Sequence, residues 1–507
     1  FNERNNIVAK VLLVYPIASV SSPMMSPPLS ILHVGESIKR FGHEVRYFDE
    51  RWDPEPDIDW PDIVGVSSMT GHQLKGAAKY LKLAKKHGKK TVFGGIHPSA
   101  VPEQCINEPY VDIVVKSEGE LAMLDAIDAE PGTIVERRMI ISQDMVSPVS
   151  EDTLRYFKKP AETGDTILLT SRGCPFRCGF CYIQNFFERS WETVDMDRWK
   201  KDILFLRDRL GMRKLEHGDD WPGKMPRILE IVKFLWDNGI QYRPSIRAHQ
   251  IDDEAAKMMA DMGIKHVSIG METGSARMLK ITEKDITKEH QVICAEALAK
   301  HNIWPLYYWI TGFPTETPEE INETLDQADL LYKIHRKNNV NCTQNFYAYT
   351  ALPGSPLYEL VDKSKLPTTI DGWSEYSLHQ THDHRANARY HIGGIRFHMG
   401  KGDNTNRNFP GIKRLLVAPF ELFALIRWKL RFFDYYWEKK PLELLLKWAS
   451  TSQMNELSHL GEEESFQINN NDRVSSIRRD NLTDKKKRKK EKIMSAKFKD
   501  NSTKPVL

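Results

Sequence analysis

Along the first 150 residues, short apolar runs alternate with longer segments in which apolar residues recur every three to four positions. Runs of the first kind are typical of buried strands, and segments of the second kind are typical of helices packed on one side. This alternation predicts a parallel sheet with helices on both faces, whose ligands bind beyond the carboxyl ends of the strands. The predicted strands are 8–15, 43–48, 63–67, 90–93 and 113–116, and the predicted helices are 29–41 and 73–87.

The same alternation resumes after residue 165 and continues to residue 360. It contains six strand–helix units, which predict a partial parallel β/α barrel. Polar residues and glycines gather where each strand ends, and barrels of this kind place their active sites at that end. The predicted strands are 166–170, 214–217, 242–247, 266–271, 304–310 and 343–348.

The last 150 residues follow a different pattern. Residues 361–410 are mixed and polar, whereas 412–437 form an apolar helical pattern interrupted by basic residues. Two interpretations of this helix stay open: it lies in a membrane surface, or it caps the barrel, which we favour. From about residue 455 onward the chain is charged and lacks any core pattern, which is typical of a disordered tail.

Composition excludes some classes of function. The chain has 72 Lys and Arg against 69 Asp and Glu, and a net charge of +3 gives no reason to expect nucleic acid as a partner. Six cysteines, three of them clustered, fit a reducing compartment better than a disulfide framework. The sequence shows no signal-peptide core and no apolar run near the roughly 20 residues that span a bilayer. We therefore expect a cytoplasmic protein, with any membrane contact peripheral and made by 412–437.

Three cysteines, Cys174, Cys178 and Cys181, follow one another with the spacing Cys-x3-Cys-x2-Cys. Thiolates are the usual ligands of iron–sulfur clusters, and a four-iron cluster normally takes four of them. Three ligands would leave one iron open to a substrate or cofactor. A structural zinc ion needs four protein ligands and no fourth stands nearby; unconnected buried thiols are the other alternative. Gly173 and Gly179 allow the loop to wrap closely around a bulky group.

The segment 171–191 resembles the cluster loop of the radical S-adenosylmethionine (SAM) superfamily. The resemblance implies that the three cysteines hold a 4Fe–4S cluster whose open iron chelates the amino and carboxylate groups of SAM. Reductive cleavage of SAM would then give a 5′-deoxyadenosyl radical, with an external flavodoxin or ferredoxin as electron donor. Tyr182, beside Cys181, is a candidate for contact with the adenine.

Polar residues at later strand ends match the same superfamily in order. The resemblance implies that Gly218, Asp219 and Asp220 bind the SAM amino group. It also implies that Arg247 meets the SAM carboxylate and that Glu272 binds the ribose hydroxyls, since carboxylates accept well from paired hydroxyls.

The loops of the first 150 residues resemble those of the cobalamin-binding domain found ahead of many radical SAM domains. The resemblance is carried by Ser26-Pro-Pro-Leu, Gly42-His-Glu-Val, Gly94-Gly-Ile-His-Pro and Ser117-Glu-Gly-Glu, and the predicted cofactor contacts are Ser67, Ser68, Gly94, Gly95, Glu118 and Gly119. The Asp-x-His-x-x-Gly pattern of other cobalamin domains is absent, because no Asp-x-His occurs in the chain. We therefore expect no histidine on the lower face of cobalt, and we assign neither His72 nor His97 as a ligand.

Together the patterns and the resemblance predict an α/β chain in four parts. They are a Rossmann-like cobalamin-binding domain (1–150), a partial (β/α)6 radical SAM barrel (160–360), a helical, substrate-facing region (361–455) and a disordered charged tail (456–507).

The resemblance implies a methyltransferase that acts on an unactivated carbon. One SAM would methylate cobalt, a second would supply the radical, and the substrate radical would take the methyl group. Two alternatives stay open: cyclisation or rearrangement with the same cofactors, and a non-catalytic cobalamin-binding module. The substrate stays open between a small molecule, a lipid and a peptide.

Overall fold

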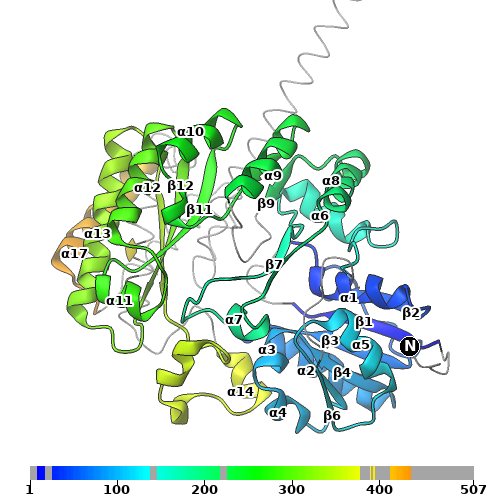
Figure 1. The fold of residues 1–507 in the computed structure, drawn as a ribbon. Coiled ribbons are helices and arrows are strands. Elements are labelled where there is room, and N and C mark those ends of the chain that lie inside the picture. The colour runs from blue at the N-terminus through cyan, green and yellow to red at the C-terminus, as the bar shows by residue number, and fades with distance from the viewer. Residues whose placement is uncertain are drawn as a thin grey trace, which may run out of the picture.

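A six-stranded parallel sheet forms the first part of the molecule (Figure 1). The computed structural model describes residues 8–17, 26–136, 145–216, 225–376, 389, 392–393 and 412–434. The strand order is β2-β1-β3-β4-β5-β6, and the strands are β1 (Lys10–Tyr15), β2 (Glu44–Asp49), β3 (Ile63–Ser67), β4 (Lys90–Gly94), β5 (Ile113–Lys116) and β6 (Thr133–Glu136). The first five match the predicted strands within two residues, and β6 was not predicted.

Alternate residues of β1 face two different helix layers. Val11 and Leu13 pack with α1 and α5, whereas Leu12 and Val14 pack with α2. Side chains alternate between the faces of a strand, and both faces of this sheet are covered, so every residue of the strand interior is apolar. The helices are α1 (Leu29–Lys39), α2 (Gln73–Lys86), α3 (Ile96–Ala100), α4 (Pro102–Ile106) and α5 (Gly119–Asp128).

Six parallel strand segments form a partial barrel in the second part (Figure 1). Ile167 bridges to β9, β9 pairs with β10, Ser245 bridges to β11, and β12 and β13 complete the series. The fold class predicted from the sequence is thereby confirmed. The elements are β9 (Lys214–Glu216), β10 (Gln241–Arg243), β11 (His266–Glu272), β12 (Trp304–Thr311), β13 (Thr343–Ala348), α8 (Met196–Leu210), α9 (Met225–Asp237), η1 (Ala248–Gln250), α10 (Asp253–Asp261), α11 (Ala276–Ile281), α12 (Lys288–Lys300), α13 (Pro318–Lys337), η2 (Pro356–Leu360) and η3 (Lys363–Lys365).

The predicted strand 166–170 is wrong in its extent. Only the bridge of Ile167 to Glu216 is present there, and the chain continues into β7 (Ser171–Gly173), which pairs antiparallel with β8 (Trp191–Thr193). Gly173 has a φ of +75°, and a Cβ at this position would lie 2.1 Å from the carbonyl oxygen of Ser190. The close approach of the two strands therefore requires glycine, and the resulting hairpin closes the base of the cysteine loop.

An apolar cluster joins the sheet to the barrel. Leu32 of α1 packs in one cluster with Tyr156 of α6 (Arg155–Thr163), Trp199 of α8 and Leu215 of β9. Between the two parts run β7 and the short helix α7 (Ile183–Phe186), as Figure 1 shows. The cysteine loop between β7 and α7 therefore lies where the two parts meet.

The described segments of the C-terminal region pack on both parts. In α14 (Ile370–Glu375), Trp373 is fully buried in the core of the first part, and its Nε1 donates to Oε1 of Gln104 at 3.1 Å. Trp373 is therefore a packing residue, whereas the sequence predicted a substrate-facing region there. Most of the predicted substrate region, and the whole predicted tail, lie outside the described residues.

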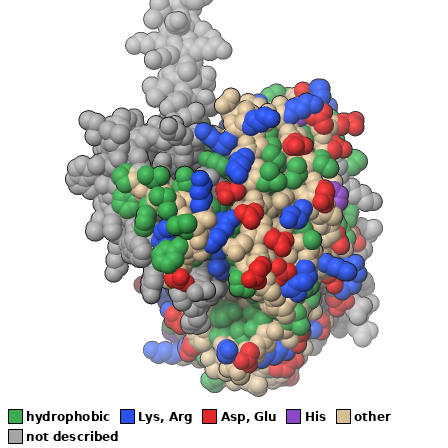
Figure 2. Space-filling view, turned by 90° about the vertical axis from the view of Figure 1, so that its left-hand side faces the viewer, with side chains coloured by type: hydrophobic (Ala, Val, Ile, Leu, Met, Phe, Trp, Pro, Cys, Tyr) green, Lys and Arg blue, Asp and Glu red, His purple; other side chains and the backbone are tan. Residues whose placement is uncertain are grey.

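Helix α17 (Ile412–Leu430) packs on the barrel as a cap. Its Trp428 is fully buried, with its ring centroid 5.1 Å from that of Phe346 in β13. Exposed apolar residues line another side of the helix: Leu422, Phe423, Ile426 and Leu430. None of the helices in the described ranges is long and apolar enough to cross a membrane. On the face shown in Figure 2, basic and acidic side chains are interspersed, in keeping with the small net charge.

Candidate functional site

Main-chain hydrogen bonds anchor the loop that carries Cys174, Cys178 and Cys181. The amide of Gly179 donates to the carbonyl of Thr282 at 2.8 Å, and the amide of Leu357 donates to the carbonyl of Gly179 at 2.7 Å. The amide of Cys181 donates to the carbonyl of Cys178 at 3.0 Å. The loop is thus fixed to two other barrel loops at its centre, which limits the positions that the thiols can take.

The three thiols differ in burial. Cys178 is buried, whereas Cys174 and Cys181 are partly exposed. Among the residues that the structure describes, no three Cys, His, Asp or Glu side chains are grouped closely enough to hold a single metal ion. A four-iron cluster, which is larger than one ion, stays the prediction for these thiols.

Arg247 lies against the cysteine loop. Its Nη1 donates to Sγ of Cys178 at 3.4 Å, and its guanidinium lies 3.7 Å from the ring centroid of Phe176. The side chain is buried, and Nε and Nη2 have no hydrogen-bond partner in the described part of the chain. Two buried N–H groups on a planar guanidinium match the two oxygens of a carboxylate. This orphaned edge fits the predicted contact with the carboxylate of SAM.

Glu272 ends β11 in an unusual backbone conformation, with a φ of +62°. Its Oε1 accepts a hydrogen bond from Nζ of Lys284 at 2.6 Å, and both side chains are buried. The ammonium group of Lys284 also lies 5.8 Å from the ring centroid of Phe180, next to Cys181. Glu272 therefore carries a cationic partner that the sequence did not reveal, and this partner lies beside Phe180 of the cysteine loop.

Three predicted SAM contacts, Gly218, Asp219 and Asp220, lie outside the described residues. Their predicted role stays untested by the geometry.

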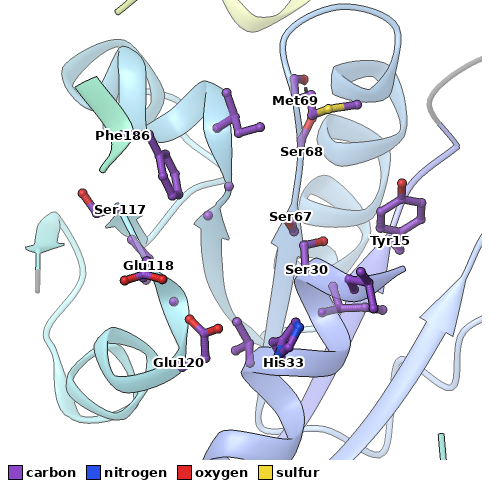
Figure 3. A pocket seen from close by; sticks show the side chains of 18 of the residues that line it. Tyr15, Ser30, His33, Ser67, Ser68, Met69, Ser117, Glu118, Glu120 and Phe186 are labelled. Carbon is purple, nitrogen blue, oxygen red and sulfur yellow. Dashed lines mark hydrogen bonds between the residues drawn. The ribbon is translucent and has the colours of Figure 1, made fainter. Parts of the chain in front are cut away.

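A cavity of about 410 Å³ opens at the carboxyl edge of the first sheet (Figure 3). Residues from both parts of the molecule line it. Every predicted cobalamin contact belongs to this lining, namely Ser67, Ser68, Gly94, Gly95, Glu118 and Gly119, and the cysteine-loop side contributes Tyr182, Ile183, Phe186 and Phe187. The structure thus brings six residues, which lie at or just after the carboxyl ends of three strands, into one wall.

Tyr182 lies in this cavity, although the sequence placed it near the adenine of SAM. Phe180, two residues earlier, packs instead with Phe313 and Leu357 of the barrel. The two aromatic residues that flank Cys181 therefore belong to different surroundings, one on the side of the first sheet and one on the side of the barrel.

Gly95 has a structural reason to be glycine. Its φ is +101°, and a Cβ would lie 2.7 Å from both the nitrogen and the oxygen of Ser68. Close contact between the loops after β3 and β4 therefore requires this residue, in addition to any approach of a ligand.

His72 and His97, which the sequence analysis did not assign as cobalt ligands, do not line the cavity. His97 is fully buried, and its Nδ1 forms a hydrogen bond with Oγ1 of Thr70 at 3.0 Å. The centroid of its ring lies 5.8 Å from that of Trp373. Burial lowers the pKa of His97 to about 4, so its ring is neutral at neutral pH.

Sequence reasoning missed two buried residues of the lining, His33 and Arg172. His33 lies in a helix with an apolar pattern, and that pattern does not distinguish a residue of the cavity from a residue of the core. Arg172 precedes the first cysteine by two positions, and its Nη1 contacts both Glu118 at 2.8 Å and Glu120 at 2.5 Å. The clustered acids of 117–120 indicate that a cation faces them, but the sequence does not indicate which one.

Comparison with known proteins gives matches to two family models. The model of the B12 binding domain matches residues 17–127, and that of the radical SAM superfamily matches residues 168–328. The first contains the six predicted cobalamin contacts in the cavity wall, and the second contains the cysteine loop, Arg247 and Glu272.

Individual relatives agree with these matches. An uncharacterised methyltransferase of Pyrococcus horikoshii is 28% identical over 73% of this chain and 86% of its own length. The anaerobic magnesium-protoporphyrin IX monomethyl ester cyclase of Rubrivivax gelatinosus is 27% identical over 60% of this chain and 59% of its own. The structure of OxsB, a cobalamin-dependent S-adenosylmethionine radical enzyme with aqua-cobalamin bound, superposes with a TM-score of 0.61 at 17% identity, covering 94% of this chain and 80% of that one. The last of these likenesses shows the fold.

Proposed function

We propose that this chain, a cobalamin-dependent radical SAM enzyme that uses a 4Fe–4S cluster, transfers a methyl group to an unactivated carbon atom of its substrate. One observation carries the proposal: a single cavity is lined both by the strand ends of the B12-binding part and by residues that directly follow the cysteine loop. A substrate radical must meet a methyl donor within contact distance, and a shared cavity provides that proximity.

When bound, the cluster and SAM supply a 5′-deoxyadenosyl radical, and cobalamin supplies the methyl group. Cys174, Cys178 and Cys181 would hold the cluster. Arg247 would orient SAM through Nε and Nη2, which no described residue engages, and Glu272 would accept from the ribose hydroxyls. Oε1 of Glu272 also accepts a hydrogen bond from the buried Nζ of Lys284 at 2.6 Å, which fixes the direction of the carboxylate.

The apolar lining contributed by the two parts would exclude water from the space between the cofactors. Apolar side chains line the cavity from both parts: Phe186 and Phe187 on one side, and Val66, Val92 and Val115 on the other. A substrate radical survives only where water and dioxygen are kept away, so this lining protects the transfer step.

Anaerobic reconstitution followed by incubation with methyl-labelled SAM and a strong reductant tests the proposal. We expect a 4Fe–4S absorbance and EPR signal, 5′-deoxyadenosine, and label both in recovered cobalamin and in the product. The triple variant C174A/C178A/C181A should lose the cluster signal and 5′-deoxyadenosine. A cluster signal that persists in this variant would contradict the assignment of the cysteines.

Cyclisation without methyl transfer is the second candidate function, because the cyclase of Rubrivivax gelatinosus is 27% identical over 60% of this chain. The same incubation separates the two. Methyl transfer leaves label in the product, whereas cyclisation gives 5′-deoxyadenosine and an unlabelled product. We favour methyl transfer because the methyltransferase of Pyrococcus horikoshii matches a larger share of both chains.

The finer points of substrate and partners are also proposals. The enzyme acts on a small molecule, with lipids and peptides as further substrate classes to be tested. An external flavodoxin or ferredoxin would supply the electron, and replacement of dithionite by either reduced protein tests this. Peripheral membrane contact would use the exposed Leu422, Ile426 and Leu430 of α17, and co-sedimentation of the full chain with anionic vesicles tests it. We keep the division at 1–150, 160–360, 361–455 and 456–507 as the proposed domain plan.

A further inference from the structure

His33 is a buried histidine in the wall of the cavity. It lies one turn into α1, near Ser30 of the same helix and Glu120 at the start of α5, and Figure 3 shows all three side chains around the same space. Only 7% of the residue is exposed. It is not one of the residues predicted to hold the cluster or SAM.

The hydrogen bonds of His33 determine where its proton lies. Nδ1 lies 3.1 Å from the carbonyl oxygen of Val146, and since a carbonyl can only accept, Nδ1 carries the hydrogen. Burial, reinforced by the positive charge of Arg172, holds the pKa of His33 well below its usual value, so the ring is neutral. Nε2 of this tautomer is therefore a lone-pair acceptor.

This acceptor has no hydrogen-bond partner within the described ranges, although it is buried. A buried acceptor without a donor is unfavourable by about 1–3 kcal/mol, so such groups are rare unless a ligand completes them. The strongest donor nearby, Arg172, is directed to Glu118 and Glu120. His33 lines the cavity, so a molecule that fills it is placed to supply the missing donor.

We propose that Nε2 of His33 accepts a hydrogen bond from a carboxamide N–H on the periphery of cobalamin, and that this contact positions the corrin ring at the carboxyl edge of the sheet. The inference rests on cobalamin as a cofactor and not on methyl transfer. The corrin carries several carboxamide side chains, which donate through N–H groups and match a neutral imidazole acceptor.

The position of His33 assigns it to the rim of the cofactor rather than to cobalt. The neighbouring Val34 lies against the first residue of α5, where a Cβ on Gly119 would lie 2.9 Å from Cγ2 of Val34. His33 therefore belongs to the side wall that α1 and α5 form together. The strand ends, which would face the ring itself, present Ser67, Ser68 and Gly95.

Two substitutions separate the acceptor from the structural hydrogen bond. His33→Asn places its amide nitrogen near the position of Nδ1, so it can still donate to Val146, but it has nothing at the position of Nε2. His33→Gln reaches the position of Nε2 with a carbonyl acceptor. His97→Asn is the matched control, because His97 is also buried, its Nε2 has no partner among the residues described, and it lies outside the cavity.

The measurement is the dissociation constant of hydroxocobalamin for the full chain with its cluster, without SAM or substrate, by equilibrium dialysis. We expect about a tenfold weaker affinity for His33→Asn, a smaller loss for His33→Gln and none for His97→Asn. If the unfolding midpoint shows that His33→Asn does not fold, His33→Phe carries the test, since it fills the ring volume without an acceptor.

Two results would overturn the proposal. One is an affinity of a folded His33→Asn or His33→Phe protein equal to that of the wild type. The other is nitrogen superhyperfine splitting in the EPR spectrum of bound cob(II)alamin that disappears in His33→Asn, because it would make His33 a ligand of cobalt. Loss of affinity without such splitting supports the carboxamide contact. Because SAM is absent, failure of methyl transfer cannot produce any of these results.

Discussion

Arg172 donates from Nη1 to Oε1 of Glu118 at 2.8 Å, and this contact links the strand before the cysteine loop to the first sheet. The same guanidinium contacts Glu120 at 2.5 Å, and all three side chains are at least nine-tenths buried. A buried cation that two carboxylates share fixes the orientation of the two parts relative to each other. Each of the three charged groups would be buried without a partner if the parts moved apart. The distance between the two cofactor sites is therefore set by an ionic contact as well as by the apolar joint.

Removal of the Arg172 charge should destabilise the protein strongly. Arg172→Met removes the guanidinium that two buried carboxylates share, and we expect the free energy of unfolding to fall by about 3–5 kcal/mol. Denaturant unfolding of the apo protein measures it. The control is Arg209→Met, which breaks an exposed pair with Glu151 and should change the same quantity by less than about 1 kcal/mol. Equal effects of the two substitutions would contradict the role of Arg172.

Arg247 should matter for SAM and not for the cluster. Arg247→Gln removes two buried donors that have no partner in the described part of the chain, and we expect SAM to bind about tenfold to a hundredfold more weakly. Isothermal titration of the cluster-loaded protein measures the affinity, and iron and sulfide analysis must show an unchanged cluster. Lys257→Gln, an exposed change in the same barrel, is the control. Loss of the cluster in Arg247→Gln would instead assign the arginine to the thiolate of Cys178.

The pair of Glu272 and Lys284 allows binding and stability to be separated. Glu272→Gln leaves the buried ammonium of Lys284 unpaired, and we expect the free energy of unfolding to fall by about 3 kcal/mol. In the double variant Glu272→Gln/Lys284→Met, stability should return while SAM affinity stays low. Denaturant unfolding and SAM titration measure the two quantities. Recovery of SAM affinity together with stability would show that Glu272 only supports the fold.

The periodicity of apolar residues and the spacing of apolar runs predicted most elements of the fold, because both parts are built from parallel strands buried on both faces. The prediction of a strand at 166–170 was wrong in its extent, because the apolar run continues into a segment whose path is set by the close approach of Gly173 to Ser190. The strand β6 was missed because it is a short edge strand, Thr133–Glu136, with no helix pattern after it.

The site was less predictable than the fold. Loop residues such as Ser67 and Glu118 could be placed at one edge because parallel strands end together. The ion-pair partners could not be predicted, because nothing in the sequence relates Arg172 to Glu118, or Lys284 to Glu272, before the chain folds. His33 was hidden for the same reason: its neighbours in the helix are apolar, and only the cavity and the carbonyl of Val146 reveal its state.

Glu316 should make stability depend on pH near neutrality. It lies in the loop after β12, where Oε2 accepts from the amides of Gly312 at 2.5 Å and Phe313 at 3.2 Å, while Oε1 is buried without a partner among the described residues. Burial raises the pKa of its carboxyl to about 7. The native state therefore holds a proton that the unfolded state, with a pKa near 4.5, has already lost.

Between pH 4.5 and 7 the folded protein binds more protons at Glu316 than the unfolded protein does, so this contribution to stability falls as the pH rises through that window. Glu316→Gln mimics the protonated form and removes the dependence. The unfolding midpoint of the variant should therefore rise relative to that of the wild type between pH 5 and 8, and comparison of the two at each pH cancels all other titrating groups. Glu319→Gln, an exposed change at the start of α13, serves as control and should show a constant difference. A constant difference for Glu316→Gln as well would mean that its carboxyl is ionised throughout, held so by a cation that reaches Oε1.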